Sequence, residues 1–138
     1  MSEPENVRVI REVYAAFGAG DVPRLLGFVD PEVVWEEPET PGVPWAGTRR
    51  GLKGVESFFA DVAAVAEVET FEPWELLAEG DRVVVLGFER HRILATGRIF
   101  ETHWAHAFTL RDGRIVHFRE YADTAAAAAA FRGGEGEG

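Results

Sequence analysis

The sequence contains no cysteine, no apolar run long enough to cross a membrane and no cluster of basic residues. Without cysteine the chain has no disulfide, no thiol nucleophile and no cysteine-ligated zinc site. A membrane-spanning helix needs about 20 consecutive apolar residues, which no stretch of this chain provides. The formal net charge of −10 argues against the basic surface that binds nucleic acid phosphates. We therefore expect a protein that binds neither nucleic acid nor a membrane.

The N-terminal segment, MSEPENVR, lacks the basic start and the apolar centre of a secretory signal peptide. Together with the absence of cysteine, this predicts a cytoplasmic protein. The chain has 138 residues, of which 46% are hydrophobic, and this is enough for one domain with its own core. We expect that domain to span residues 1–132, followed by a disordered acidic tail, GGEGEG, at residues 133–138.

The first half of the sequence has the pattern of amphipathic helices. Ser2 and Glu5 have the spacing of a capping box, and apolar residues follow at helical intervals. Asp21 is expected to cap a second, shorter helix. A third helix, with a broad apolar face, is expected after Gly51. Three helices therefore precede the strand-rich part of the chain.

Between the second and third helices the sequence predicts a strand and a long loop. Residues 33–37 have the character of a short strand, ended by Pro38. Residues 39–50 are rich in proline and glycine, which predicts a loop. Trp45 in this loop has too much apolar surface to be left in water, so we expect it to fold back as a lid.

After Glu67 the pattern changes to strands separated by turns. The turns at residues 79–81, 95–97 and 112–113 divide this part into four long strands, and Asp-Gly at the last turn is a strong hairpin signal. Asp123 then precedes a short, alanine-rich helix. Helices followed by a meander predict an α+β fold, with three N-terminal helices packed on a curved antiparallel sheet. Such a sheet forms a cone whose open end can admit a small molecule.

Three stretches of the chain resemble the NTF2-like superfamily, and more narrowly its SnoaL-like and ketosteroid-isomerase-like branch. They are FGAGDVPRLLGFVDPEVVWEEP, PWAGTRRGLKGVESFF and TLRDGRIVHFREYADT. The resemblance implies an NTF2-like cone and a homodimer formed through the outer face of the sheet. The superfamily includes isomerases, polyketide cyclases, epoxide hydrolases, dehydratases and many proteins without a demonstrated activity. Because one fold serves many reactions, the resemblance predicts the fold rather than the reaction.

The resemblance also points to candidate site residues. Glu37 stands where ketosteroid isomerases have their proton-shuttling aspartate, or else it is a surface glutamate at a strand end, with Glu36 facing inward instead. Tyr14 lies one position from the oxyanion tyrosine, and His106 stands at the second oxyanion donor. Asp123 matches an aspartate that acts in polyketide cyclases and epoxide hydrolases, or else it caps the following helix. Because every steroid-isomerase residue is replaced, steroid isomerase activity is not predicted.

Strand alternation adds Glu120 to these candidates. His106 shares the apolar side of its strand with Trp104, whereas His103 has the opposite parity. On the neighbouring strand the apolar side carries Phe118 and Glu120, so Glu120 is expected to be a buried carboxylate. We expect it to be hydrogen-bonded to His106 across the two strands. The histidines have no metal-ligand spacing, and no metal site is expected.

We therefore expect a cone that binds a small hydrophobic molecule and performs acid–base chemistry of the isomerase, cyclase or dehydratase type on a carbonyl compound, without a metal or organic cofactor. The alternative is a non-catalytic ligand-binding or accessory protein, in which the same polar residues are caps and buried pairs. The candidate catalytic residues are His106, Asp123, Glu37 and Glu120. The candidate ligand contacts, all of types that also form cores, are Tyr14, Trp35, Trp45, Phe59, Trp104 and Phe118.

Overall fold

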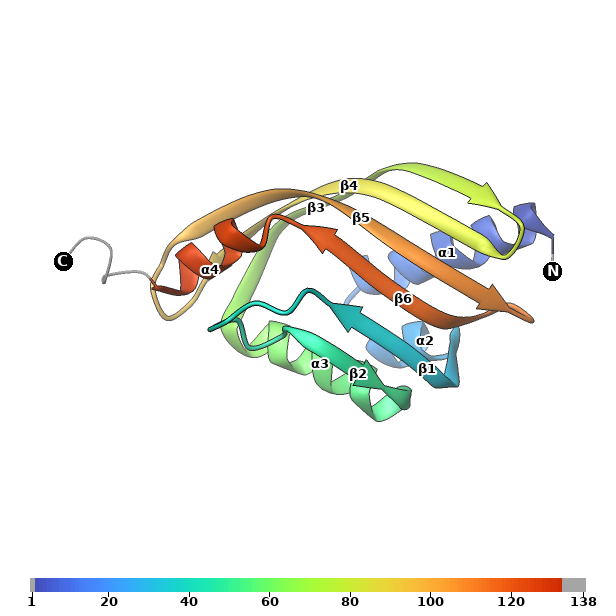
Figure 1. Cartoon of the computed structure of the whole chain (residues 1–138), viewed down its shortest axis with the longest axis horizontal. Coiled ribbons are helices and arrows are strands. Elements are labelled where there is room, and N and C mark those ends of the chain that lie inside the picture. The colour runs from blue at the N-terminus through green and yellow to red at the C-terminus, as the bar shows by residue number, and fades with distance from the viewer. Residues whose placement is uncertain (1, 133–138) are drawn as a thin grey trace.

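The computed structural model describes residues 2–132, and the tail expected to be disordered lies outside them. Figure 1 shows the elements in chain order. They are α1 (Glu3–Gly18), α2 (Val22–Leu26), β1 (Val29–Glu37), β2 (Gly47–Arg50), α3 (Gly51–Val65), β3 (Ala66–Glu79), β4 (Arg82–Ile93), β5 (Ile99–Arg111), β6 (Arg114–Ala122) and α4 (Thr124–Arg132). Within the described range no helix is both long and apolar enough to cross a membrane.

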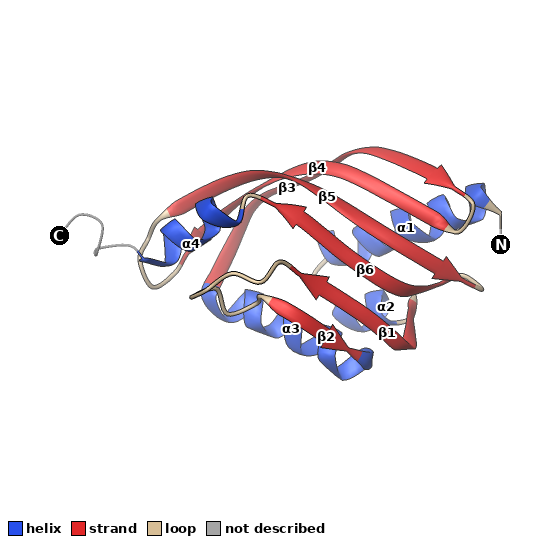
Figure 2. Ribbon diagram, viewed as in Figure 1, coloured by secondary structure: helices blue, strands red, loops and turns tan. Residues whose placement is uncertain are grey.

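The strands form one curved sheet in the order β2-β1-β6-β5-β4-β3. The antiparallel meander predicted for β3 to β6 is confirmed, and β1 joins the other side of β6 in parallel. Helices α1, α2 and α3 lie on the concave side of the sheet, while α4 lies at one end of it (Figure 2). The predicted α+β class and the arrangement of helices on one face of a cone are therefore confirmed.

The region between α2 and α3 differs from the prediction. Part of the expected loop, Gly47–Arg50, is the short edge strand β2, which pairs antiparallel with β1. Strand β1 also begins at Val29 rather than residue 33, and its pairing with β6 is interrupted by an irregularity after Val29. A four-residue strand of glycine, threonine and arginine has no apolar alternation from which it could be predicted. It forms because it satisfies backbone groups on the free edge of β1.

The capping box at the start of α1 and the hairpin turn between β5 and β6 are both present, as the sequence predicts. The Ser2 hydroxyl accepts a hydrogen bond from the Glu5 backbone N–H at 3.3 Å, and the Glu5 carboxylate accepts one from the Ser2 N–H at 3.2 Å. At the β5–β6 turn, Asp112 and Gly113 have φ angles of 53° and 76°. Two successive positive φ angles are typical of the type I′ hairpin turn that Asp-Gly favours.

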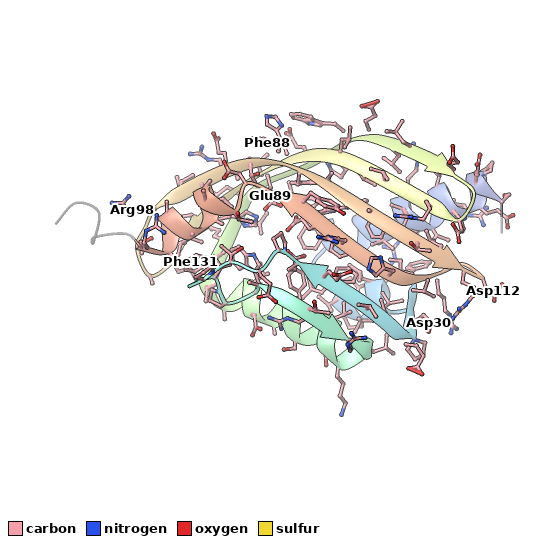
Figure 3. The ribbon with its side chains drawn as sticks, in the orientation of Figure 1. Asp30, Phe88, Glu89, Arg98, Asp112 and Phe131 are labelled. Atoms are coloured by element: carbon pink, nitrogen blue, oxygen red, sulfur yellow. The ribbon has the colours of Figure 1, made fainter. Side chains whose placement is uncertain are left out.

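The core lies between the helices and the concave face of the sheet. Ile10 of α1 and Val55 of α3 are fully buried against strand residues such as Val83 and Phe108. Side chains alternate along β4, so that Phe88 lies on the convex side and Glu89 on the concave side (Figure 3). The alternation therefore decides which polar residues enter the apolar interior.

Candidate functional site

A cavity of about 80 Å³ lies in the interior, between the three N-terminal helices and the concave face of the sheet. Most of its lining is aromatic or aliphatic. Five of the six expected ligand contacts line it: Tyr14, Trp35, Trp45, Phe59 and Phe118. Five polar residues of the sheet join them at the wall of the cavity: Glu37, Glu89, His91, His106 and Glu120. An apolar cavity with a few converging polar groups is typical of a small-molecule site.

A chain of hydrogen bonds connects α1 to the sheet through this wall. The Tyr14 hydroxyl lies 2.7 Å from Nδ1 of His106, and Nε2 of His106 lies 2.8 Å from Oε2 of Glu120. Burial, with the nearby Glu120 and Glu89 carboxylates, raises the pKa of Tyr14 well above its usual 10.0. The protonated hydroxyl therefore donates to Nδ1, which leaves Nε2–H to donate to Glu120.

Glu37 extends this chain by one more group. Its side chain faces inward and the residue is 5% exposed, whereas Glu36 lies on the outer face, hydrogen-bonded to His117. Burial, the charge of Glu120 and the hydrogen bond to Glu120 raise the pKa of Glu37 well above its usual 4.5. Burial would also raise the pKa of Glu120, but hydrogen bonds from His106 and Glu37 outweigh it and lower that pKa. Glu37 is thus the protonated member of the pair and Glu120 the ionised one.

The proton on Glu37 should make stability depend on pH. Because its pKa is higher in the folded chain, the native state holds a proton that the unfolded state releases above about pH 4.5. Stability then falls as pH rises, by up to about 1.4 kcal/mol per pH unit for one group. We expect Glu37→Gln, whose amide still donates to Glu120, to reduce this fall and to be more stable than the wild type at about pH 8. Urea denaturation across pH measures both quantities.

Two neighbouring groups, Glu89 and Arg49, also affect this pH dependence. Burial also raises the pKa of Glu89, so some of the pH dependence should persist in Glu37→Gln, while Arg49 acts on Glu37 in the opposite direction. Glu36→Gln is the matched control, because it makes the same change one residue away on the outer face. An unchanged pH slope in Glu37→Gln would show that Glu37 does not carry the proton.

A second histidine–carboxylate pair lines the cavity and was not among the residues predicted from sequence. Nε2 of His91 lies 2.7 Å from Oε2 of Glu89, and both residues of β4 are buried. Applying strand alternation to β4 would have found them, because they share the parity of Val83 and Val85.

Asp123, a predicted catalytic residue, does not line this cavity and caps a helix. Its carboxylate accepts a hydrogen bond from the Ala126 backbone N–H at 3.0 Å, at the start of α4. Its own backbone N–H donates to Thr102 at 2.9 Å. Of the two roles open for this residue, the structure supports the helix cap, which accounts for an acidic residue at this position.

Trp104, a predicted ligand contact, is also absent from the lining of the cavity. Its ring stacks on the imidazole of His106, with centroids 3.9 Å apart, and packs against Tyr14 and Phe71. Gly87 on β4 makes room for it: a Cβ there would lie 2.4 Å from the Trp104 ring. Trp104 therefore packs behind His106 and does not line the cavity.

The remaining histidines lie on the convex side of the sheet. His103 packs against Trp74 and Phe88, and His117 pairs with Glu36. Trp45, the expected lid, lines the cavity and packs on His91 and Phe131, with ring centroids 6.0 and 5.4 Å away. Across residues 2–132, no group of three or more histidine, aspartate or glutamate side chains is arranged to hold a metal ion.

A cone-shaped sheet with this interior defines an NTF2-like protein. Residues 10–118 match the SnoaL-like domain, and the chain belongs to that family. It is 31% identical over 129 residues to an uncharacterised protein of Mycobacterium tuberculosis, covering 91% of this chain and 95% of that protein. An NTF2-like protein from Burkholderia xenovorans superposes with a TM-score of 0.87 at 37% identity, covering 95% of this chain and 98% of that one. TerC co-crystallised with polyporic acid gives a TM-score of 0.77 at 29% identity, over 93% and 98%.

Proposed function

We propose that the cavity binds a small, planar, largely apolar carbonyl compound and moves protons on it without a cofactor. The observation that supports this most directly is the buried chain Tyr14–His106–Glu120–Glu37, which holds one proton acceptor and one proton donor. Such a chain in an apolar cavity is unusual for a purely structural core, because burying charged groups has a high free-energy cost. The co-crystallisation of the relative TerC with polyporic acid is consistent with an organic ligand.

The chain can accept a proton at the Tyr14 oxygen. As the ligand proton reaches that oxygen, the Tyr14 hydroxyl proton passes to Nδ1 of His106, and the Nε2 proton passes to Glu120. The negative charge then resides on the ligand as an enolate, and Glu120 is neutral. The Glu37 carboxyl supplies a proton to a different ligand atom, which completes an isomerisation or a dehydration step. Because Glu120 is a weak base, the ligand proton must be acidic, as it is next to a carbonyl group.

A single-ring substrate tests this proposal. Cyclohex-3-en-1-one rearranges to its conjugated isomer when one proton is removed beside the carbonyl and another is added at the far end of the double bond. We expect the wild-type protein to accelerate this reaction, followed by ultraviolet absorbance. Glu37→Gln and Tyr14→Phe should each reduce the rate by about 100-fold, the usual size of a general acid–base contribution.

The control for this assay is Glu36→Gln, which leaves the cavity unchanged and should retain the wild-type rate. Wild-type protein that is no faster than buffer of the same pH would disprove the catalytic part of the proposal. Equal rates in Glu36→Gln and Glu37→Gln would show that the inward-facing carboxyl takes no part.

The second candidate function is ligand binding without catalysis. It is favoured by one observation: both ring nitrogens of His106 are already engaged by Tyr14 and Glu120. A fully paired histidine rigidifies a core as well as it relays a proton. Saturable binding of cyclohex-3-en-1-one without any acceleration of its rearrangement would establish this function.

The convex face of the sheet supports the homodimer that the family resemblance implies. Trp74 and Tyr121 are 58% and 51% exposed there. The Trp74 ring stacks on Phe88, with centroids 5.9 Å apart and planes 6° from parallel, and His103 packs beside both. Exposed aromatic residues that gather on one face are typical of protein interfaces.

Trp74→Glu should therefore convert a dimer to a monomer, because it places a charge at the centre of the apolar contact. Analytical ultracentrifugation measures the molecular mass directly. Leu94→Glu makes a comparable change at a residue that is 50% exposed beyond the end of β4, and it should leave the dimer intact. A monomeric wild type would contradict the proposed interface.

A further inference from the structure

The Glu89–His91 pair lines the cavity but has no part in the function proposed above. Nε2 of His91 is paired with Glu89 at 2.7 Å. Its other ring nitrogen, Nδ1, is buried and has no hydrogen-bond partner among residues 2–132. An unpaired buried polar atom costs about 1–3 kcal/mol, so we expect another molecule to pair with it when the protein is at work.

The pair at His106 shows what such a partner would be. Both pairs are built alike, with a glutamate carboxylate on Nε2 of the imidazole. In His106 the Nδ1 atom is then satisfied by the hydroxyl of Tyr14 at 2.7 Å. His91 has no counterpart of that hydroxyl within the described chain. An aromatic hydroxyl group is therefore the chemistry that the protein itself uses to complete this arrangement.

The surroundings of His91 favour a planar ligand as the source of the hydroxyl. Its ring is stacked on Phe100, with centroids 5.1 Å apart and planes 17° from parallel, and Trp45 lies 6.0 Å away. Both His91 and Trp45 line the cavity, and because Nδ1 of His91 is covered in this structure, a ligand must shift a neighbouring ring to reach it. Water is a poorer partner in such surroundings, because a buried water needs about two to four polar contacts.

We propose that His91 is a ligand-binding residue that accepts the hydroxyl group of a phenolic or enolic ligand at Nδ1, with Glu89 holding the imidazole in place. This rests on the proposed function, in which the cavity takes a small planar molecule. In the bound complex the ligand O–H donates to Nδ1. If the proton transfers fully, the O–H bond breaks and an N–H bond forms, which leaves a phenolate beside an imidazolium that Glu89 stabilises. The step needs no oxidant, reductant or further reactant.

Two probes of nearly the same shape test this assignment by isothermal titration calorimetry. 4-Nitrophenol, titrated at a pH well below its own pKa so that it keeps its proton, has the hydroxyl group, and 4-nitroanisole has a methoxy group that cannot donate. We expect the wild type to bind 4-nitrophenol about tenfold more tightly than 4-nitroanisole, the size of one buried hydrogen bond. His91→Phe should remove this preference and leave the affinity for 4-nitroanisole within about twofold of the wild type.

Further variants keep the test decisive if His91→Phe does not fold. Glu89→Gln retains the His91 ring and an acceptor for Nε2–H but removes the charge, and it should reduce the preference for the hydroxyl by several-fold. His117→Gln removes a histidine from the convex side and should keep the wild-type preference.

The outcomes separate this inference from the proposed function. A wild type that binds both probes equally well, or a His91→Phe variant that keeps the preference, would overturn the role of His91 and leave the proposed function standing. Equal binding would point to water as the partner of Nδ1. A wild type that binds neither probe would overturn the proposed function together with this inference.

Discussion

Replacing Gly87 with alanine should destabilise the protein by about 3 kcal/mol or more, because the new methyl group has no space. A Cβ at this position would lie 2.4 Å from the Trp104 ring and 2.5 Å from the backbone carbonyl oxygen of Glu72. Rotating the Trp104 side chain relieves the first contact but not the second, since the second atom belongs to the backbone of β3. Thermal and urea denaturation would measure the loss.

The same substitution should also disturb the site. Trp104 cannot remain stacked on His106 while a methyl group occupies the space above Gly87. Gly18→Ala is a suitable control, because a Cβ there meets no atom outside its own stretch of helix within 4 Å and Gly18 ends a helix. A Gly87→Ala protein as stable as Gly18→Ala would show that the strands around Gly87 shift to accommodate the methyl group.

Removing the imidazole at position 106 should cost about 3–5 kcal/mol of stability, the range for leaving a buried charge without its partner. His106→Phe fills much of the same volume but leaves the Glu120 carboxylate without its nitrogen partner. The His106 and Glu120 side chains are only 9% and 12% exposed, so water cannot replace the lost hydrogen bond. The hydroxyl of Tyr14 also loses its acceptor.

A double variant distinguishes the effect of the unpaired Glu120 carboxylate from the effect of lost packing at position 106. In His106→Phe with Glu120→Gln the buried position is neutral, and we expect part of the stability to return. His117→Gln breaks a histidine–glutamate pair whose side chains are 36% and 31% exposed, and it should cost less than about 1 kcal/mol. A double variant no more stable than His106→Phe would mean that the charge of Glu120 is not the cause.

Strand alternation predicted the contact between His106 and Glu120 because both lie in long strands with a clear apolar side. Alternation could not decide between Glu36 and Glu37, since β1 is interrupted near its start and ends at a proline, which leaves its register undetermined from one sequence. The choice is made by the pairing of β1 with β6, a contact between segments far apart in the chain. Long-range pairing of this kind is not visible in local sequence patterns.

The contact of Tyr14 with His106 could not be predicted from helix geometry alone. The resemblance puts Val13 at the position of the oxyanion tyrosine, and one residue corresponds to about 100° of rotation on a helix. Both Val13 and Tyr14 nevertheless line the cavity, because the helix lies across its wall and the tyrosine side chain is long enough to reach His106. A large side chain therefore reaches farther than the rotation between Cα positions indicates.

The contact between Trp45 and Phe131 links the cavity to the last helix of the described chain. Trp45 lines the cavity from the loop before β2, and its ring packs on Phe131 at the end of α4. Helix α4 is mostly alanine and contributes few large side chains to the core. Loosening of α4 would therefore also release the Trp45 side of the cavity, so the shape of the cavity depends on how firmly a small, alanine-rich helix is held against the sheet.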